Sequence, residues 1–148
     1  MSDYKVIGTD HAAFTVSNME RSVKLFCEVL GFRVVSDDMA EAGLVQTLNG
    51  IPASVRYVYL RGPDNYQVEL LQYFGPPDKT RVTYRHCDTA ASHLAIRVDN
   101  VPAAVEAAKR AGMTIYNQIM TIEDKEGLTQ SAYMRDPDGL TIELLSRP

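Results

Sequence analysis

The chain has 148 residues, of which 45% are hydrophobic, with a formal net charge of −4. Its length is within the range of one compact domain with a buried core. The acidic balance and the lack of a basic stripe argue against nucleic acid as a partner, and no apolar run is long enough to cross a membrane. The first eight residues lack a signal-peptide pattern and two cysteines make no disulfide framework, so we expect a cytoplasmic location.

The first half of the chain predicts one helix and four strands. Residues 11–16 alternate between an apolar and a mixed face, which is typical of a strand. Ser17 and Glu20 form a capping-box pattern, which predicts a helix that ends at Gly31. Further strands are expected over residues 32–37, 55–62 and 66–74, and the connection over residues 39–52 has room for a short helical turn.

The second half repeats this order. Residues 92–98 predict a strand, Asp99 or Asn100 caps a helix with Pro102 in its first turn, and Gly112 ends that helix. Strands are expected over residues 113–122, 128–135 and 140–146, with a polar loop over residues 123–127. The pattern is βαβββ twice, which indicates an α+β fold. We expect a single domain with module 1 over about residues 5–75, a linker over 76–90 and module 2 over about 91–147.

One twelve-residue segment occurs twice. RGPDNYQVELLQ (residues 61–72) returns as RDPDGLTIELLS (residues 135–146), with six of the twelve positions identical and a glutamate, Glu69 or Glu143, at the same place. Upstream of each copy a histidine interrupts an otherwise apolar strand: His11 in DHAAFTV and His93 in SHLAIRV. Two imidazoles and two carboxylates on a duplicated scaffold predict one shared metal site.

The alternation of side chains along a strand supports this prediction. The residues on either side of Glu69 and Glu143 are apolar and point away from the glutamates. We expect that apolar face to pack on the helix of its unit, so that the opposite face can carry both glutamates together with His11 and His93. A carboxylate beside so much apolar surface is costly unless it is paired or binds a metal.

Other candidate residues have less support. His86 and Cys87 are adjacent in the linker, but adjacent residues of an extended segment point apart, so we interpret them as exposed linker residues. Cys27 falls in the predicted helix and is expected to pack as a small apolar group. For the candidate pocket residues, ordinary packing is the alternative interpretation; they are Tyr57, Tyr59, Tyr133, Arg97 and Gln46.

Three segments carry a resemblance to a known superfamily: DHAAFTVSNMERSVKLFCEVLGF, SHLAIRVDNVPAAVEAAKRAG and RDPDGLTIELL. With the tandem βαβββ order, the chain resembles the vicinal oxygen chelate superfamily over nearly its whole length. That superfamily includes glyoxalase I, epimerases, extradiol dioxygenases, fosfomycin-modifying enzymes and bleomycin-resistance proteins. The resemblance implies a curved, eight-stranded mixed sheet around a metal site. Its ligands come from the first and last strand of each unit, by position His11, Glu69, His93 and Glu143.

Such a site predicts one divalent ion (Ni, Co, Mn, Fe or Zn), because a mixed nitrogen and oxygen set does not choose among these metals. Four protein ligands leave two octahedral positions for a substrate with neighbouring oxygens. We therefore expect an isomerase, an epimerase or a glyoxalase I-like lyase that acts on a small α-oxygenated carbonyl substrate through a metal-stabilised enediolate. The resemblance implies Glu143, or else Glu69, as the base, with Glu143 as the leading candidate.

Two alternative functions stay open: an extradiol-type ring-cleaving dioxygenase, and a non-catalytic small-molecule-binding protein of the resistance type. Extradiol enzymes use three metal ligands, so Glu69 as a fourth ligand argues against them. We expect a homodimer, with neither nucleic acid nor a membrane as partner. The sixteen-residue linker (residues 75–90) can serve a site within one chain, which we favour, or a site shared between the swapped halves of two chains.

Overall fold

The computed structural model describes residues 4–148 and divides them into two compact units. The first unit runs up to Val23 and continues over Gly31–Pro76, and the second comprises Lys24–Leu30 and Pro77–Pro148. Residues 1–3, with which the expected domain and the N-terminal segment begin, lie outside the described residues. None of the helices in residues 4–148 is long and apolar enough to span a membrane.

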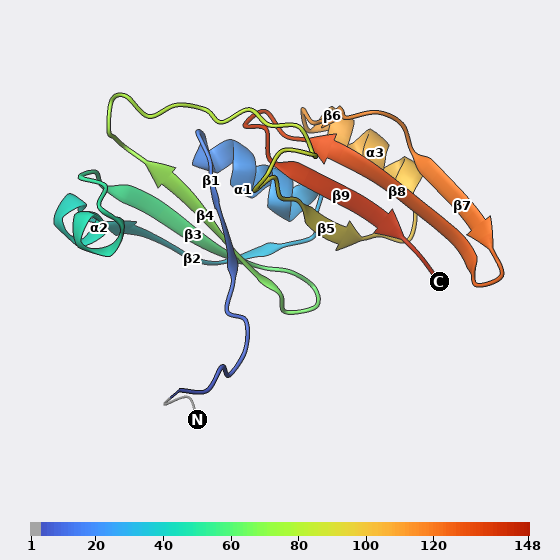
Figure 1. The fold of residues 1–148 in the computed structure, drawn as a ribbon, viewed down its shortest axis with the longest axis horizontal. Coiled ribbons are helices and arrows are strands. Elements are labelled where there is room, and N and C mark those ends of the chain that lie inside the picture. Colours follow the sequence, from blue (N-terminus) through green and yellow to red (C-terminus); the bar gives the residue numbers. More distant parts are fainter. Residues whose placement is uncertain (1–3) are drawn as a thin grey trace. The chain divides into compact units, whose positions relative to one another are not determined.

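The first unit is built on a four-stranded sheet (Figure 1). Its strands lie in the order β1 (Ala12–Thr15), β4 (Gln67–Tyr73), β3 (Val55–Arg61) and β2 (Arg33–Ala40). Strand β1 runs parallel to β4, and the other neighbouring strands are antiparallel. Helix α1 (Met19–Glu28) follows β1, and helix α2 (Ala42–Asn49) connects β2 to β3. The helical turn expected in that connection is therefore an eight-residue helix.

The second unit repeats this order on a five-stranded sheet. Its strands are β5 (Leu94–Arg97), β9 (Thr141–Ser146), β8 (Gly127–Arg135), β6 (Thr114–Ile115) and β7 (Met120–Asp124). Strand β5 is parallel to β9, whereas β6 and β7 both pair antiparallel with β8. Helix α3 (Val101–Arg110) packs against β8 and β9. The predicted α+β class and the repeated βαβββ order are confirmed.

The strand expected over residues 113–122 is two strands, β6 and β7. The partner of Ile115 is Met134, and the partner of Ser131 is Met120 rather than residue 118. Two extra residues therefore lie opposite β8, and the hydrogen-bonded ladder breaks there, as it does at a β-bulge. Because the insertion has an even length, the side chains of β7 keep the alternation of β6. The described chain thus has nine strands in two hydrogen-bonded sheets.

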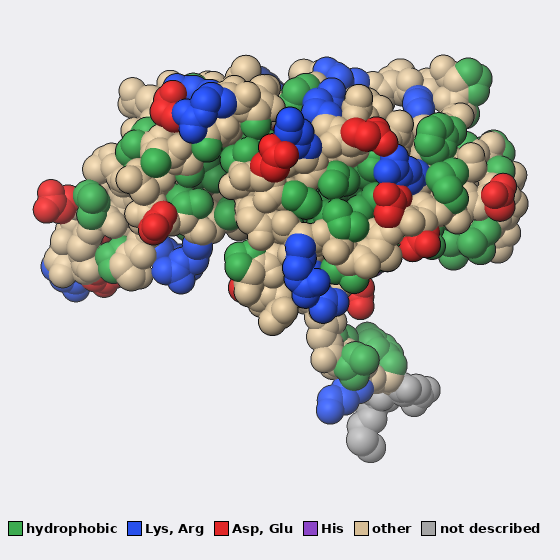
Figure 2. Space-filling view, turned by 180° about the vertical axis from the view of Figure 1, so that it is seen from behind, with side chains coloured by type: hydrophobic (Ala, Val, Ile, Leu, Met, Phe, Trp, Pro, Cys, Tyr) green, Lys and Arg blue, Asp and Glu red, His purple; other side chains and the backbone are tan. Residues whose placement is uncertain are grey.

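One face of each sheet is apolar and buried, as the alternation predicted. In the first unit Val58, Leu60, Val68 and Leu70 have no exposed surface. In the second unit Met134 and Ile142 are equally buried, and Ala132 and Leu144 are 1% exposed. Side chains alternate between faces, so the opposite face of each sheet carries the glutamates. Elsewhere on the surface, Figure 2 shows basic and acidic side chains interspersed over the face that it displays.

Both long helices begin at an asparagine. Asn18 Oδ1 accepts a hydrogen bond from the Arg21 N–H at 2.9 Å, which corrects the predicted capping box of Ser17 and Glu20. The reason is that α1 begins only at Met19, one residue later than a Ser17 cap requires. In the second unit Asn100, not Asp99, caps α3 by accepting the Ala103 N–H at 3.0 Å.

Arg56 on β3 joins helix α1 to the first sheet. Its Nε and Nη2 donate to the two carboxylate oxygens of Asp37 at 2.9 and 2.8 Å, and its Nη1 donates to Glu20. These hydrogen bonds with Arg56 hold the pKa of Asp37 and of Glu20 below their ordinary values. The arginine thus binds one residue of β2 and one residue of α1 at the same time.

Replacing Asn100 with Ala should lower the free energy of unfolding by about 1 kcal/mol, because the Ala103 N–H loses its acceptor. Replacing the neighbouring Asp99 with Ala is the matched control and should change the free energy of unfolding by less than about 0.5 kcal/mol. Urea denaturation measures both values. Equal losses in the two variants would contradict the assignment of the cap.

The contribution of Arg56 to stability should depend on pH. Since the pKa values of Glu20 and Asp37 are lowered in the folded state, their contribution is present above their unfolded pKa values and is lost as the pH falls through the folded ones. The difference in unfolding free energy between the wild type and Arg56→Gln should be largest near neutral pH and shrink below about pH 4. A difference that stays constant between pH 7 and pH 3 would show that the carboxylates are not responsible.

Candidate functional site

The first candidate ligand pair is His11 and Glu69. His11 lies just before β1, and the parallel register places Ala13 of β1 beside Glu69 of β4. Nε2 of His11 lies 3.2 Å from Oε2 of Glu69. The other ring nitrogen, Nδ1, lies 2.6 Å from Oδ1 of Asp10. A histidine that is oriented by a carboxylate on one nitrogen and faces a second ligand with the other is typical of metal sites.

The second candidate pair, His93 and Glu143, repeats this geometry. His93 lies just before β5, and Ala95 is the register partner of Glu143 on β9. Nε2 of His93 lies 3.2 Å from Oε2 of Glu143, the same distance as in the first unit. Each glutamate side chain is only 14% exposed. A carboxylate with so little access to water needs a cation or strong hydrogen-bond donors nearby.

A tyrosine from the neighbouring strand lies against each pair. Tyr59 is the register partner of Glu69, and its ring meets the His11 ring edge-on at 5.3 Å. Tyr133 is the register partner of Glu143 and meets the His93 ring in the same way at 5.2 Å. Burial, followed by the hydrogen bond with Glu69, raises the pKa of Tyr59 to about 12. Burial, followed by the negative charge of Glu143, also raises the pKa of Tyr133. Both phenols are therefore protonated at neutral pH and can donate to their glutamates.

The two pairs differ in the residues that support them. Ser131 on β8 donates a hydrogen bond of 2.7 Å to Oε1 of Glu143. The corresponding position beside Glu69 is Tyr57, whose ring instead packs edge-on against Tyr59 at 6.1 Å. Ser131 is buried, so the hydroxyl is held in place. Glu143 is thus fixed by a hydroxyl that Glu69 does not have, whereas Asp10 orients the histidine of the first pair.

The donor atoms of each pair fit a shared metal ion. Two ligand atoms that each lie about 2.1 Å from an ion, at a right angle to each other, are separated by roughly 3 Å. The Nε2–Oε2 distance of 3.2 Å in both pairs is close to that separation. Among residues 4–148, no three His, Cys, Asp or Glu side chains gather into one metal-holding group. Each unit therefore supplies two candidate ligands of the four that the sequence predicted.

The remaining sequence candidates for the pocket are exposed. Gln46 is exposed on α2, and Arg97 is exposed at the end of β5, where it donates to the carbonyl of Arg147 at 3.5 Å. Cys27 and Cys87 form no disulfide within the described part of the chain. Cys27 is half-buried on α1, and Cys87 is exposed, as predicted.

His86 has contacts that the sequence did not predict. The residue is exposed in the linker, as expected, but its ring stacks on Tyr116 with centroids 4.3 Å apart. It also lies 4.8 Å from the ring of Tyr133, which contacts His93 on another side. The sequence carried no signal for this contact, because it depends on the path of an irregular segment.

The supporting residues Ser131 and Asp10 were also missed. A signal for Ser131 was present, because it lies two residues before Tyr133 and so shares the face of that strand. Recognising it would have required the register of β8 against β9, which places Ser131 within reach of Glu143. Asp10 is adjacent to His11 in the sequence and could have been proposed as its orienting carboxylate.

The chain belongs to the glyoxalase/bleomycin resistance protein/dioxygenase superfamily, whose family model matches residues 8–144. This finding confirms the resemblance that the sequence segments indicated.

Curated relatives of the chain include enzymes of two kinds. A 2-epi-5-epi-valiolone epimerase of Actinomyces sp is 29% identical over 148 residues, covering 96% of this chain and 80% of the relative. A lactoylglutathione lyase of Haemophilus influenzae is 30% identical over 136 residues, covering 91% of this chain and 89% of the relative.

Among solved structures, a glyoxalase family protein from Bacillus cereus aligns with a TM-score of 0.86 at 18% identity, covering 99% of this chain and 98% of the other. The fosfomycin resistance protein FosX from Listeria monocytogenes was solved with Mn(II) and sulfate. It aligns with a TM-score of 0.63 at 12% identity, covering 97% of this chain and 95% of the other. These likenesses show the fold.

Proposed function

We propose that the protein is a divalent-metal-dependent enzyme that moves a proton on a small α-oxygenated carbonyl substrate, as an epimerase, an isomerase or a glyoxalase-like lyase. The observation that carries this proposal is the repeated His–Glu pair, with the same Nε2–Oε2 distance of 3.2 Å in both units. The names of the relatives, one an epimerase and the other a lactoylglutathione lyase, support the same class of reaction. Both units would together form one functional domain.

The metal would be held by His11, Glu69, His93 and Glu143. This nitrogen and oxygen set suits Ni, Co, Mn, Fe or Zn. When bound, such an ion polarises a substrate carbonyl and makes the neighbouring C–H more acidic. One ion would be bound by two His–Glu pairs. Both pairs would come from one chain, or each chain of a homodimer would supply one pair.

The two glutamates would have different roles in the proton transfer. A carboxylate that acts as base must move between its ligand position and the substrate carbon. Both glutamates have a neighbouring tyrosine hydroxyl, but Ser131 additionally restrains Glu143 through Oε1. The equivalent position beside Glu69 is Tyr57, whose ring packs on Tyr59. We therefore propose Glu69 as the more mobile base, in place of Glu143, the leading candidate from the sequence. Glu69 would take the proton from the substrate and return it, and Glu143, held by Ser131, would stay in its ligand position.

A four-ligand site separates this proposal from the two alternatives. An extradiol dioxygenase uses a facial triad with one carboxylate, so a second ligating glutamate would leave less room for dioxygen. A non-catalytic binding protein of the resistance type has no need of two basic carboxylates on one face. The placement of Glu69 and Glu143 in equivalent positions, each against a histidine, favours the proton-transfer enzyme.

Purified protein should contain about one divalent ion per chain, and His11→Ala or His93→Ala should remove most of it, because each variant loses a primary nitrogen ligand. Elemental analysis after dialysis measures the metal content. His86→Ala removes the third histidine, which is not a proposed ligand, and should leave the content unchanged. Light scattering on the same samples measures whether the protein is the expected dimer. Wild-type metal content in both ligand variants would remove the basis of the site.

Glu69→Gln should lower turnover by roughly 100-fold or more, the usual effect of removing a general base, because the amide keeps an oxygen ligand but is not basic. Glu143→Gln should lower turnover less than Glu69→Gln does. When Ser131→Ala is added to both variants, the difference between their turnover losses should become smaller. The assay is deuterium exchange from solvent into a panel of α-hydroxy and α-keto carbonyl compounds, with metal content measured in parallel.

Two outcomes of this assay would count against the proposal. Wild-type exchange rates in both glutamine variants, with metal retained, would exclude these carboxylates as bases. Substrate-dependent oxygen uptake by the wild type, without deuterium in any carbonyl compound, would instead support the dioxygenase alternative.

A further inference from the structure

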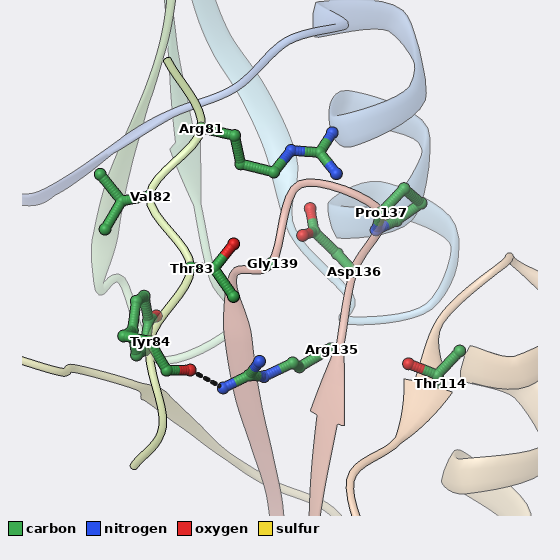
Figure 3. Close-up of a pocket in the computed structure, with 9 residues that line it drawn as sticks. All are labelled: Arg81, Val82, Thr83, Tyr84, Thr114, Arg135, Asp136, Pro137 and Gly139. Atoms are coloured by element: carbon green, nitrogen blue, oxygen red, sulfur yellow. Dashed lines mark hydrogen bonds between the residues drawn. The ribbon is translucent and has the colours of Figure 1, made fainter. Parts of the chain in front are cut away.

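A cavity of about 230 Å³ lies in the second unit, beside the turn between β8 and β9. One wall is the linker segment 81–84, and the other is the turn segment 135–137 with Gly139 and Thr114. In Figure 3 the side chains of Arg81 and Arg135 extend from these two walls, with Thr83 between them in this view. The cavity thus brings together two guanidinium groups and a threonine hydroxyl.

The guanidinium of Arg135 lacks a carboxylate partner in the described chain. Its Nη2 donates to the carbonyl oxygen of Tyr84 at 2.5 Å (Figure 3). Its Nε is buried and has no hydrogen-bond partner. The rings of Tyr84 and Tyr116 lie 5.4 and 5.0 Å from its central carbon. A buried donor without an acceptor is costly, and the aromatic faces compensate for only part of that cost.

The repeated arginine has a different acceptor in each unit. Arg61 is the equivalent residue in the first unit, and it donates to Oε1 of Gln67 at 3.1 Å. Thr141 occupies the position of Gln67 in the second unit, as the register partner of Arg135. Its hydroxyl is itself buried without a hydrogen-bond partner. Nη2 of the arginine thus binds a side-chain amide in the first unit and a backbone carbonyl in the second, where Nε stays without a partner.

The carboxylates of the cavity already have partners. Asp138 pairs with Arg81 at 3.3 Å. Asp136 is buried, and its Oδ1 accepts the backbone N–H groups of Asp138 and Leu140 at 2.9 and 2.8 Å. Arg135 is therefore the cation of the cavity that has no ion pair with a carboxylate among the described contacts, and the unpartnered Nε–H can donate to an oxygen that a ligand brings.

We propose that this cavity binds a small oxyanion, the carboxylate or phosphate group of a ligand, through the guanidinium of Arg135. Arginine suits this role because its planar group of donors matches the oxygens of carboxylate and phosphate. The hydroxyl of Thr83 supplies a further donor.

The position of Arg135 on β8 indicates that the oxyanion is the charged end of the substrate. This assignment rests on the proposed function. Arg135 follows Tyr133 by two residues on β8, so both side chains lie on one face, about 7 Å apart along the strand. Tyr133 contacts His93 of the second ligand pair. A short carbon chain with an oxyanion at one end and the reacting carbonyl at the other spans such a separation. The substrate class is thereby narrowed to anionic α-oxygenated carbonyl compounds.

The binding test uses metal-free protein, so that it does not depend on catalysis. Inorganic phosphate and glycolate are titrated at low ionic strength, and the side-chain Nε–H signal of each arginine is followed by nuclear magnetic resonance. We expect the Arg135 signal to move with either anion and the Arg61 signal to stay in place. Tighter binding of phosphate would indicate a phosphorylated substrate, and tighter binding of glycolate a carboxylate.

Variants make the test specific. Arg135→Gln should weaken anion binding by about 10- to 100-fold, the range for a charge-assisted hydrogen bond, and Arg135→Lys should weaken it less, because it keeps the charge. Arg61→Gln is the matched control and should bind as the wild type does. Circular dichroism establishes that each variant is folded. Equal affinity in the wild type, Arg135→Gln and Arg135→Lys, or an equal loss in Arg61→Gln, would overturn the proposal.

The second arm distinguishes this inference from the proposed function. With metal restored, Arg135→Gln should raise the KM for anionic carbonyl substrates by about 10-fold or more and leave kcat within a few fold. Anion binding without any deuterium exchange would overturn the proposed function and leave the oxyanion site in place. Exchange that proceeds with unchanged KM in Arg135→Gln would overturn the link between cavity and substrate.

Discussion

The arrangement of both ligand pairs depends on the parallel pairing of the first and last strands in each unit. Parallel strands cannot be joined by a tight turn, and in both units a long connection of helix and further strands lies between them. This connection brings a residue from the start of the unit beside one from its end. In each unit the histidine just before the first strand is placed beside a glutamate on the last strand through a single register, Ala13 with Glu69 and Ala95 with Glu143. A shift of one residue would turn the glutamate toward the buried apolar side of its sheet.

The same pairing separates the roles of the two sheet faces. One face supplies the buried apolar side chains that stabilise the unit, and the other can therefore carry polar groups that contribute little to folding. The glutamates are nearly buried at 14% exposure, next to tyrosines with protonated phenols. The duplicated scaffold keeps the primary residues alike while the supporting residues differ, with Asp10 in the first unit and Ser131 in the second.

The sequence predicted the strands, the helices and both His–Glu pairs because these depend on local alternation and on an internal repeat. The repeat was decisive, since an isolated histidine or glutamate on a strand has many structural explanations. The sequence did not predict the hydrogen bond of Ser131 with Glu143 or the contacts of His86, because both depend on which residues of separate segments become neighbours. The cap of α1 was assigned to Ser17 instead of Asn18, because both residues are good caps and only the start of the helix decides between them.

The two-residue insertion between β6 and β7 has a consequence for how this sheet tolerates change in length. An insertion of even length leaves the inward and outward orientation of the later residues intact, so the hydroxyl of Ser131 still lies opposite Met120 on the face of the glutamate. An odd insertion at the same place would exchange the two faces of β7 and bring Thr121 and Glu123 where Met120 and Ile122 now lie. The segment between β6 and β7 can therefore change in length by two residues at a time. Such changes keep the same side chains of β7 on the sheet face that carries Glu143.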